Sequence, residues 1–320
     1  MNKLKYSEMF YSLQGEGRYV GVPSVFLRLF GCNFECRGFG QDRDKSKWLP
    51  EAQMTHNQNH PNVKTIKDLP IPHVGCDSSF SWGKKWGHLA DNDDIGTIIK
   101  KMDELTNWYG SKERMDNDLS VCLKHDDGVH LVITGGEPLL KGFQPAVREL
   151  ITSPDLKTKF ITFETNGTQV FEPTKDHTTS PSRKYAPSPI ANYPEYIGKY
   201  GVGKNTGITW SVSPKLSNSG EKFSDAIRPE ALVSYNAWPY SYLYLKFVIR
   251  DEYDLIQVEQ AVKEYDNAKI NIDAIYLMPE GGTSDGLKLT DLDVAQIALK
   301  HGYKYSPRLH INLFGNEWGT

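Results

Sequence analysis

The sequence predicts an α/β fold built on a mostly parallel sheet, arranged as a barrel or an open sheet. Short apolar segments typical of buried strands alternate along the chain with amphipathic segments typical of helices. This alternation favours βαβ units, in which helical crossovers connect parallel strands. We find no internal repeat and no linker-like segment, so a single domain over residues 1–320 is the simplest interpretation.

The candidate strands are short apolar runs rich in β-branched and aromatic residues. They are Ser24–Phe30, His130–Thr134, Phe160–Glu164, Thr209–Val212, Leu243–Ile249, Ile275–Met278 and Leu309–Phe314. The candidate helices place apolar residues at helical spacing and lie between several of these strands. They are Ile95–Trp108, Pro145–Ile151, Leu255–Tyr265 and Leu292–His301, and Asp291 is predicted to cap the last of them.

Two long polar segments interrupt this alternation, and we expect both to be insertions. Residues 37–74 are rich in Asn, Asp, Lys and Pro and show no sustained hydrophobic period. Residues 168–207 are similar and contain five prolines. Loops of this length in a compact domain are usually functional, partly structured or mobile.

Composition and charge exclude several classes of protein. The formal net charge is −3, so there is no basic excess of the kind that marks a general nucleic-acid footprint. The hydrophobic content of 38% and charged content of 24% fit a globular protein rather than a disordered one. The first residues lack the apolar core of a signal peptide, and no apolar run is long enough to span a membrane. We therefore expect a cytoplasmic protein that contacts neither membrane nor nucleic acid directly.

Cysteine spacing gives the first indication of chemistry. Four cysteines in a cytoplasmic chain are expected to be ligands, catalysts or core residues rather than disulfides. Cys32 and Cys36 form a C-x3-C pair directly after an apolar strand. On spacing alone this pair fits an iron–sulfur cluster or a zinc ion. Cys122 lies in an ordinary stretch and is expected to be a small buried hydrophobe.

A glycine pair gives the second indication. Gly135, Gly136, Glu137 and Pro138 follow the strand His130–Thr134. Two glycines let the backbone approach a ligand closely, and the Glu137 carboxylate offers an acceptor for an ammonium group. Alone, this segment is read more simply as a tight turn between a strand and a helix. Its combination with the C-x3-C pair is far more specific.

With both motifs, the sequence resembles the radical S-adenosylmethionine (SAM) superfamily. In that superfamily three thiolates hold a 4Fe–4S cluster and leave one iron open for the amino and carboxylate groups of SAM. One electron then cleaves the sulfonium and gives a 5′-deoxyadenosyl radical. The resemblance implies a partial (β/α) barrel and assigns the Gly-Gly-Glu-Pro turn to the amino group of SAM.

The third cluster ligand departs from the usual C-x3-C-x2-C pattern, since Phe39 stands where the third cysteine belongs. Cys76 is predicted to replace it across a long insertion. Its neighbours, residues 75–82, read GCDSSFSW and resemble the third-cysteine segment of the 7-carboxy-7-deazaguanine synthases, which carry Cys-Asp-Thr and often a Trp. Cys122 is the rival third ligand, and its context matches nothing in the pattern.

The resemblance to this subfamily extends over most of the chain. The matching segments are residues 8–17 (EMFYSLQGEG), 21–28 (GVPSVFLR), 164–168 (ETNGT), 213–215 (SPK), 307–310 (PRLH) and 313–316 (LFGN). The two insertions have no counterpart. The resemblance implies conversion of 6-carboxy-5,6,7,8-tetrahydropterin into 7-carboxy-7-deazaguanine, with loss of ammonia and regeneration of SAM. It also implies an electron donor such as flavodoxin or ferredoxin, and a homodimer.

The resemblance further implies which residues bind the pterin. They are Leu13, Gln14, Gly15, Glu16, Arg28, Glu164 and His310. Arg28 would hold the substrate carboxylate through a bidentate fork, and Glu16 would accept from the guanidine-like edge of the ring. The alternative is that Arg28 and Glu16 form structural ion pairs. His310 is expected at the start of a strand.

The remaining implied contacts concern the cofactors. The SAM-binding residues are Gly135, Gly136, Glu137, Thr165, Ser213 and Lys215. Ser78 stands where the family's threonine helps to hold Mg²⁺, and it keeps the hydroxyl that such an ion needs. Two other functions stay open: another radical SAM enzyme such as an activating enzyme, and a non-catalytic iron–sulfur or zinc-binding protein.

Overall fold

The computed structural model describes residues 2–107, 129–156, 158–173, 207–238 and 241–320. Cys122 and most of the insertion expected at 168–207 therefore lie outside the described residues. Within the described ranges, no helix is both long enough and apolar enough to cross a membrane.

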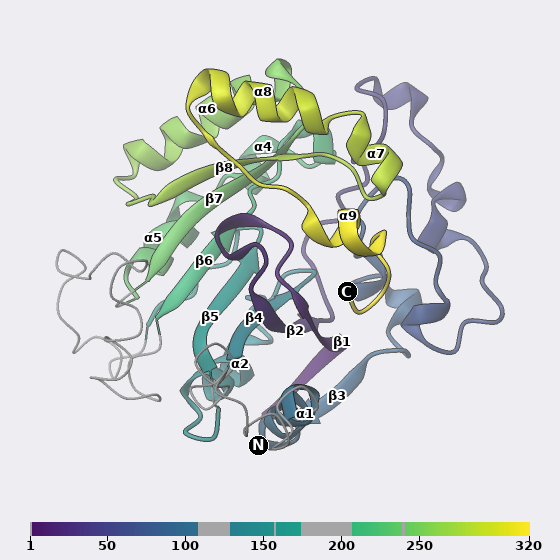
Figure 1. Cartoon of the computed structure of the whole chain (residues 1–320), viewed down its shortest axis with the longest axis vertical. Helices are drawn as coiled ribbons and strands as arrows, with labels where there is room; N and C mark the ends of the chain where they lie inside the picture. The colour runs from purple at the N-terminus through teal and green to yellow at the C-terminus, as the bar shows by residue number, and fades with distance from the viewer. Residues whose placement is uncertain (1, 108–128, 157, 174–206, 239–240) are drawn as a thin grey trace, which may run out of the picture.

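The described strands form one sheet in the order β3-β1-β2-β4-β5-β6-β7-β8-β9. They are β1 (Lys3–Leu13), β2 (Pro23–Leu29), β3 (Asp91–Asp94), β4 (Val129–Gly135), β5 (Thr158–Thr165), β6 (Ile208–Val212), β7 (Tyr242–Ile249), β8 (Ala274–Pro279) and β9 (Lys304–Tyr305). All neighbours from β2 to β9 pair in parallel, whereas β1 pairs antiparallel with both β2 and β3. The sheet is curved and open (Figure 1), so the prediction of a mostly parallel α/β fold is confirmed.

Helices cover the sheet between its parallel strands, as βαβ connections require. They are α1 (Ile95–Asn107), α2 (Gln144–Thr152), α4 (Phe223–Ala226), α5 (Pro229–Asn236), α6 (Glu252–Asn267), α7 (Ser284–Lys288), α8 (Asp291–His301) and α9 (Leu309–Phe314). Figure 1 shows α5, α6 and α8 along one face of the sheet and α9 beside the end of β1. The backbone N–H of Leu309 donates to the carbonyl of Gly15 at 2.9 Å, which ties the C-terminal segment to β1.

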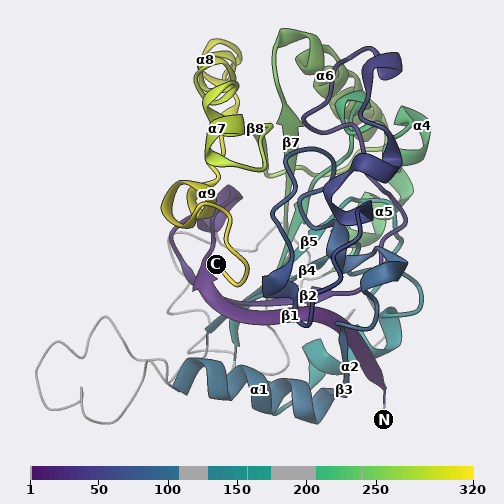
Figure 2. The same cartoon turned by 90° about the vertical axis from the view of Figure 1, so that its right-hand side faces the viewer.

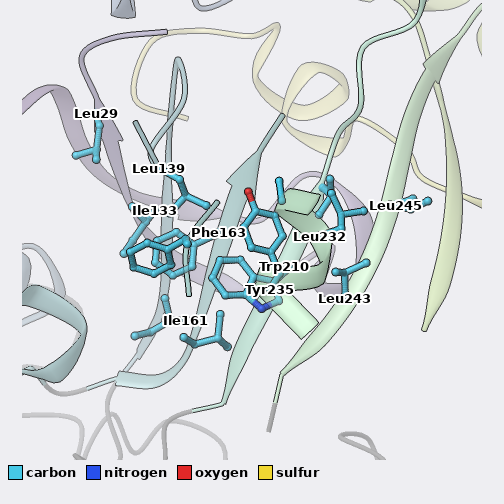
Figure 3. Close-up of a cluster of buried hydrophobic side chains, with 14 of the residues drawn as sticks. Leu29, Ile133, Leu139, Ile161, Phe163, Trp210, Leu232, Tyr235, Leu243 and Leu245 are labelled. Atoms are coloured by element: carbon cyan, nitrogen blue, oxygen red, sulfur yellow. The ribbon is translucent and has the colours of Figure 1, made fainter. Parts of the chain in front are cut away.

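The core lies between the parallel strands and the helices that cover them (Figure 3). Phe163 of β5 and Trp210 of β6 are fully buried and stack with ring centroids 5.0 Å apart. Tyr235 of α5 stacks on the other side of Trp210 at 4.5 Å. Burying a large side chain of this kind stabilises a protein by about 1.5–3 kcal/mol. This packing holds β5 and β6 against α5.

Two sequence predictions are wrong. Residues Leu309–Phe314 form the helix α9 rather than a strand, and Gly315 ends it in the left-handed conformation with φ 65°. A short apolar run does not distinguish the two structures by periodicity alone. His310 therefore lies in the first turn of a helix. Asp291 is the first residue of α8 rather than its cap, which is Thr290.

The first insertion leaves the domain and returns to it at one point. The backbone N–H of Gly75 donates to the carbonyl of Phe39 at 2.7 Å, so the two ends of the insertion are adjacent. Between them the chain forms short 3-10 turns: η2 (Lys45–Lys47), η3 (Glu51–Gln53), η4 (Thr55–Asn57) and η5 (Ile66–Asp68). Figure 2 shows this dark blue segment between α6 and β1. Arg43 anchors it there by donating to Asp254 of α6 at 2.8 Å.

Candidate active site

A cavity of about 590 Å³ opens at the carboxyl ends of the parallel strands. Each strand from β4 to β8 contributes wall residues where it ends, among them Gly135, Thr165, Ser213, Val248 and Glu280. Active sites of α/β proteins gather at this edge because the loops that follow the strands converge there. Every site residue predicted from the sequence lines this cavity except Glu137.

The structure brings Cys32, Cys36 and Cys76 together on one wall of the cavity, where they pack in one cluster with Phe34 and Phe39. Cys32 and Cys36 follow β2, and Cys76 follows the returning end of the insertion. The contact between Gly75 and Phe39 therefore puts Cys76 next to the position that the usual third cysteine would occupy. The rival ligand Cys122 lies outside the described residues.

Burial disfavours free ionisation of the three thiols. Burial raises the pKa of the Cys32 thiol to about 12, and it also raises the pKa values of Cys36 and Cys76. A metal would supply the positive charge that ionises them. Among the residues described, no group of His, Cys, Asp and Glu side chains forms a site for a single metal ion. Three thiols on one cavity wall are the donor set that a 4Fe–4S cluster with one open iron would require.

The glycine pair lies directly against the cysteine loop. A Cβ atom on Gly135 would lie 2.4 Å from the carbonyl oxygen of Leu29, and one on Gly136 would lie 2.2 Å from that of Gly31. The backbone N–H of Glu137 donates to the same Gly31 carbonyl at 2.7 Å. Only glycine fits at these positions, and both expose backbone to the cavity.

Glu137 does not point into the cavity, contrary to the expectation that its carboxylate receives the amino group of SAM. The side chain is fully buried, and its carboxylate accepts from the hydroxyl of Thr165 and from the backbone N–H groups of Asn166 and Leu139, all at 2.8–2.9 Å. Burial raises the pKa of this carboxyl group to about 7. Glu137 thus ties the glycine turn to the loop after β5.

The cavity is also lined by a buried network of ion pairs centred on Glu16. Its carboxylate pairs with Lys246 of β7 and, at 3.0 Å, with Arg308. Arg308 also pairs with Asp77 at 2.6 Å, so this network reaches the residue next to Cys76. Burial alone would raise the pKa of Glu16, but the charges of Lys246 and Arg308 outweigh burial and hold that pKa well below its usual value. Glu16 is therefore ionised at neutral pH.

Lys246, Arg308 and Asp77 were not predicted as site residues. Lys246 had a signal in the sequence, because it interrupts the apolar strand Leu243–Ile249. His310 lies near Glu16, with 4.0 Å between its Nε2 and the carboxylate, and burial lowers its pKa to about 4. His310 is therefore neutral at pH 7.

The other predicted pterin contacts line the same cavity. Gln14 donates from Nε2 to Glu164 at 3.0 Å and accepts from the backbone N–H of Glu16 at 3.1 Å. Arg28 pairs through Nε with Glu8 at 2.7 Å, which matches the structural ion pair considered for it. Glu16 also forms the structural ion pair considered for it, with Lys246 and Arg308. Both Arg28 and Glu16 nevertheless line the cavity.

The predicted cofactor contacts also lie at the cavity. Lys215 donates from Nζ to the Ser213 hydroxyl at 3.1 Å, in the loop after β6. The Ser78 hydroxyl lies 3.5 Å from the sulfur of Cys76. Thr165 lines the cavity, but its hydroxyl donates to Glu137.

An open parallel sheet that gathers three cysteines and a glycine pair at its carboxyl edge is the arrangement expected of a radical SAM protein. No protein-family model matches the chain. The chain is 28% identical to 7-carboxy-7-deazaguanine synthase of Halobacterium salinarum, over 98% of the chain and 91% of that protein. It is 24% identical to the synthase of Rhodopirellula baltica, over 100% of the chain and 90% of that protein. The chain is thus a homologue of the 7-carboxy-7-deazaguanine synthases.

One shorter match is to a protein of the same name, and one solved structure also aligns with the chain. The synthase of Escherichia coli strain K12 is 27% identical over 140 residues, which is 43% of the chain and 44% of that protein. The crystal structure of QueE from Escherichia coli aligns with 96% of this chain and 95% of its own, at 19% identity and a TM-score of 0.45.

Proposed function

We propose that the chain is a radical SAM lyase that converts 6-carboxy-5,6,7,8-tetrahydropterin into 7-carboxy-7-deazaguanine with loss of ammonia. One observation carries the proposal: the segments that resemble the synthases, although far apart in the sequence, meet around a single cavity. The similarity to curated synthases over nearly the whole chain supports the same reaction.

The cysteine wall would hold the 4Fe–4S cluster. Cys32, Cys36 and Cys76 provide three thiolates, which leaves one iron for SAM. When bound and reduced, such a cluster supplies the electron that cleaves SAM. The glycine pair beside Cys32 offers open backbone to the amino group of SAM, and Ser213 with Lys215 offers a hydroxyl and a positive charge to its ribose or carboxylate.

The ion-pair network centred on Glu16 would hold the pterin. Glu16, kept ionised by Lys246 and Arg308, accepts hydrogen bonds from the guanidine-like edge of the ring. Arg28 uses Nε for Glu8, which leaves its terminal nitrogens for the substrate carboxylate. His310 is neutral at pH 7, so it binds through one donor and one acceptor nitrogen rather than through charge.

Further parts of the proposal follow from the same relationship. Ser78 contributes a hydroxyl ligand to Mg²⁺ beside the substrate carboxylate. A small protein such as flavodoxin or ferredoxin supplies the electron, and the enzyme is a cytoplasmic homodimer of the queuosine pathway.

The proposal is tested by anaerobic reconstitution of the cluster, followed by incubation with the pterin, SAM and a reductant. Mass spectrometry should detect 7-carboxy-7-deazaguanine, and a coupled assay should detect ammonia. A cluster-loaded protein that cleaves SAM but leaves this pterin intact would favour another radical SAM enzyme. Zinc in place of iron, with no cluster absorbance, would favour a non-catalytic binding protein.

A further inference from the structure

The sulfur of Cys76 accepts a hydrogen bond from an aromatic side chain. The indole Nε1 of Trp82 donates to Cys76 Sγ at 3.5 Å, within the range for a sulfur acceptor. The Ser78 hydroxyl lies at the same distance from this sulfur. The sulfur of Cys32 accepts from a backbone N–H, that of Phe34 at 3.4 Å. Cys76 also has a backbone hydrogen bond, from Ser78, but its indole donor belongs to a side chain that can be replaced.

A tight turn places the Trp82 indole against Cys76. After Cys76 the chain enters η6 (Ser79–Ser81), and the backbone N–H of Trp82 donates to the Ser79 carbonyl at 3.3 Å. The Ser81 carbonyl accepts from the N–H of Gly31 at 2.8 Å, which fixes the turn to the segment just before Cys32. The indole is therefore held by the same backbone that positions two of the three cysteines.

Aromatic packing also holds the η6 turn in place. Phe80 is 2% exposed, and its ring meets the Trp318 ring edge-on with centroids 4.7 Å apart. Trp82 itself is half-buried and lines the cavity next to Cys76. Because the turn is anchored on both sides, the N–H group of Trp82 is held in place before any ligand binds.

We propose that Trp82 is a positioning residue that raises the reduction potential of the cluster through its hydrogen bond to Cys76. This inference rests on the proposed function, because it needs a 4Fe–4S cluster on Cys76. Reduction adds a negative charge that is shared by the cluster and its sulfur ligands. A donor hydrogen aimed at one sulfur stabilises the reduced form more than the oxidised form, and such bonds are known to set cluster potentials.

The chain offers matched variants for a test. Trp82→Phe keeps an aromatic ring but removes the N–H, and Trp82→His keeps a ring N–H. Trp86→Phe is the control, because Trp86 lies in the next turn, is 4% exposed and does not line the cavity. The midpoint potential of each reconstituted protein would be measured by redox titration with detection of the reduced cluster by electron paramagnetic resonance.

We expect Trp82→Phe to shift the midpoint to a more negative potential, Trp82→His to shift it less, and Trp86→Phe to leave it unchanged. Equal potentials in wild type and Trp82→Phe, with intact clusters in both, overturn the inference and leave the proposed function standing. A wild-type protein that assembles no cluster overturns both.

A second measurement uses the wild-type protein, so it remains possible if the Trp82 variants lose the cluster. Wild-type protein labelled with ¹⁵N at the tryptophan indoles should show a magnetic coupling between the reduced cluster and one indole nitrogen. The coupling should persist in Trp86→Phe. Its absence in wild type contradicts the hydrogen bond, even if Trp82→Phe fails to fold.

Discussion

Gly136 lies against the loop that carries Cys32, and the structure leaves no room there for a methyl group. A Cβ atom would lie 2.2 Å from the Gly31 carbonyl oxygen and 2.6 Å from the Cβ of Cys32. Since unbonded heavy atoms settle at about 3.5–4.0 Å, the two segments must move apart by about 1 Å. Gly31 cannot yield easily, because its carbonyl accepts from the N–H of Glu137 at 2.7 Å.

Gly136→Ala should therefore damage both stability and the cluster site. Overpacking of this kind costs about 1–3 kcal/mol. Metal and catalytic sites tolerate displacements of only about 0.5 Å, so a shift of Cys32 should lower the iron retained per chain. Urea unfolding of the iron-free protein measures the first effect, and iron and sulfide content after anaerobic reconstitution measures the second.

Gly142→Ala is the matched control, because no atom lies within 4 Å of a Cβ built at that position. It should keep the wild-type stability and iron content. If Gly136→Ala behaves like Gly142→Ala in both assays, the close contact between the glycine pair and the cysteine loop is not what positions Cys32.

Three further predictions concern the walls of the cavity. Lys246→Met should lower the free energy of unfolding by about 3–5 kcal/mol, because it removes one cation from the buried Glu16 carboxylate. The control Lys288→Met, at an exposed position, should leave that free energy unchanged. Equal urea midpoints for the two variants would refute the stabilising role of Lys246. Burial raises the pKa of Glu137 from 4.5 to about 7, so the folded protein holds this proton more tightly than the unfolded chain. The resulting contribution to the free energy of unfolding, up to about 3 kcal/mol, is fully present below about pH 4.5 and is lost as the pH rises through 7. The difference in unfolding free energy between wild type and Glu137→Gln should therefore change between about pH 5 and pH 8, and a constant difference would refute the assignment. Ser78→Ala should abolish any stimulation of turnover by added Mg²⁺, whereas an unchanged response would place the ion elsewhere.

The sequence predicted the parallel strands because they are buried on both faces. Ile275–Met278 reads as a continuous apolar run and Leu243–Ile249 as one interrupted only by Lys246, and the structure extends each by one or two residues only. Strand β1 (Lys3–Leu13), which lies between β3 and β2, was missed because most of its positions are polar or partly exposed. Helix α9 was mistaken for a strand because its six residues are too few to show a helical period.

The site was predictable where local spacing carries the chemistry and was missed where contacts form between distant segments. The cysteines and the glycine pair were predicted as site residues from their neighbours in the sequence, and the structure places them at one cavity. Glu137 was expected to face the cofactor, because nothing in its own segment shows that Thr165 and Asn166 already bond to its carboxylate. The pairing of Arg308 with both Glu16 and Asp77 joins three separate segments, and no local pattern reveals it.

The most direct test of the account asks which cysteine completes the cluster. Cys76→Ala and Cys122→Ala would each be reconstituted anaerobically beside wild type, and the iron content and the spectrum of the reduced cluster would be recorded. Cys122→Ala should keep the wild-type iron content and spectrum, whereas Cys76→Ala should lose the 4Fe–4S signal. A normal cluster in Cys76→Ala, with its loss in Cys122→Ala, would contradict the site described around the returning end of the insertion.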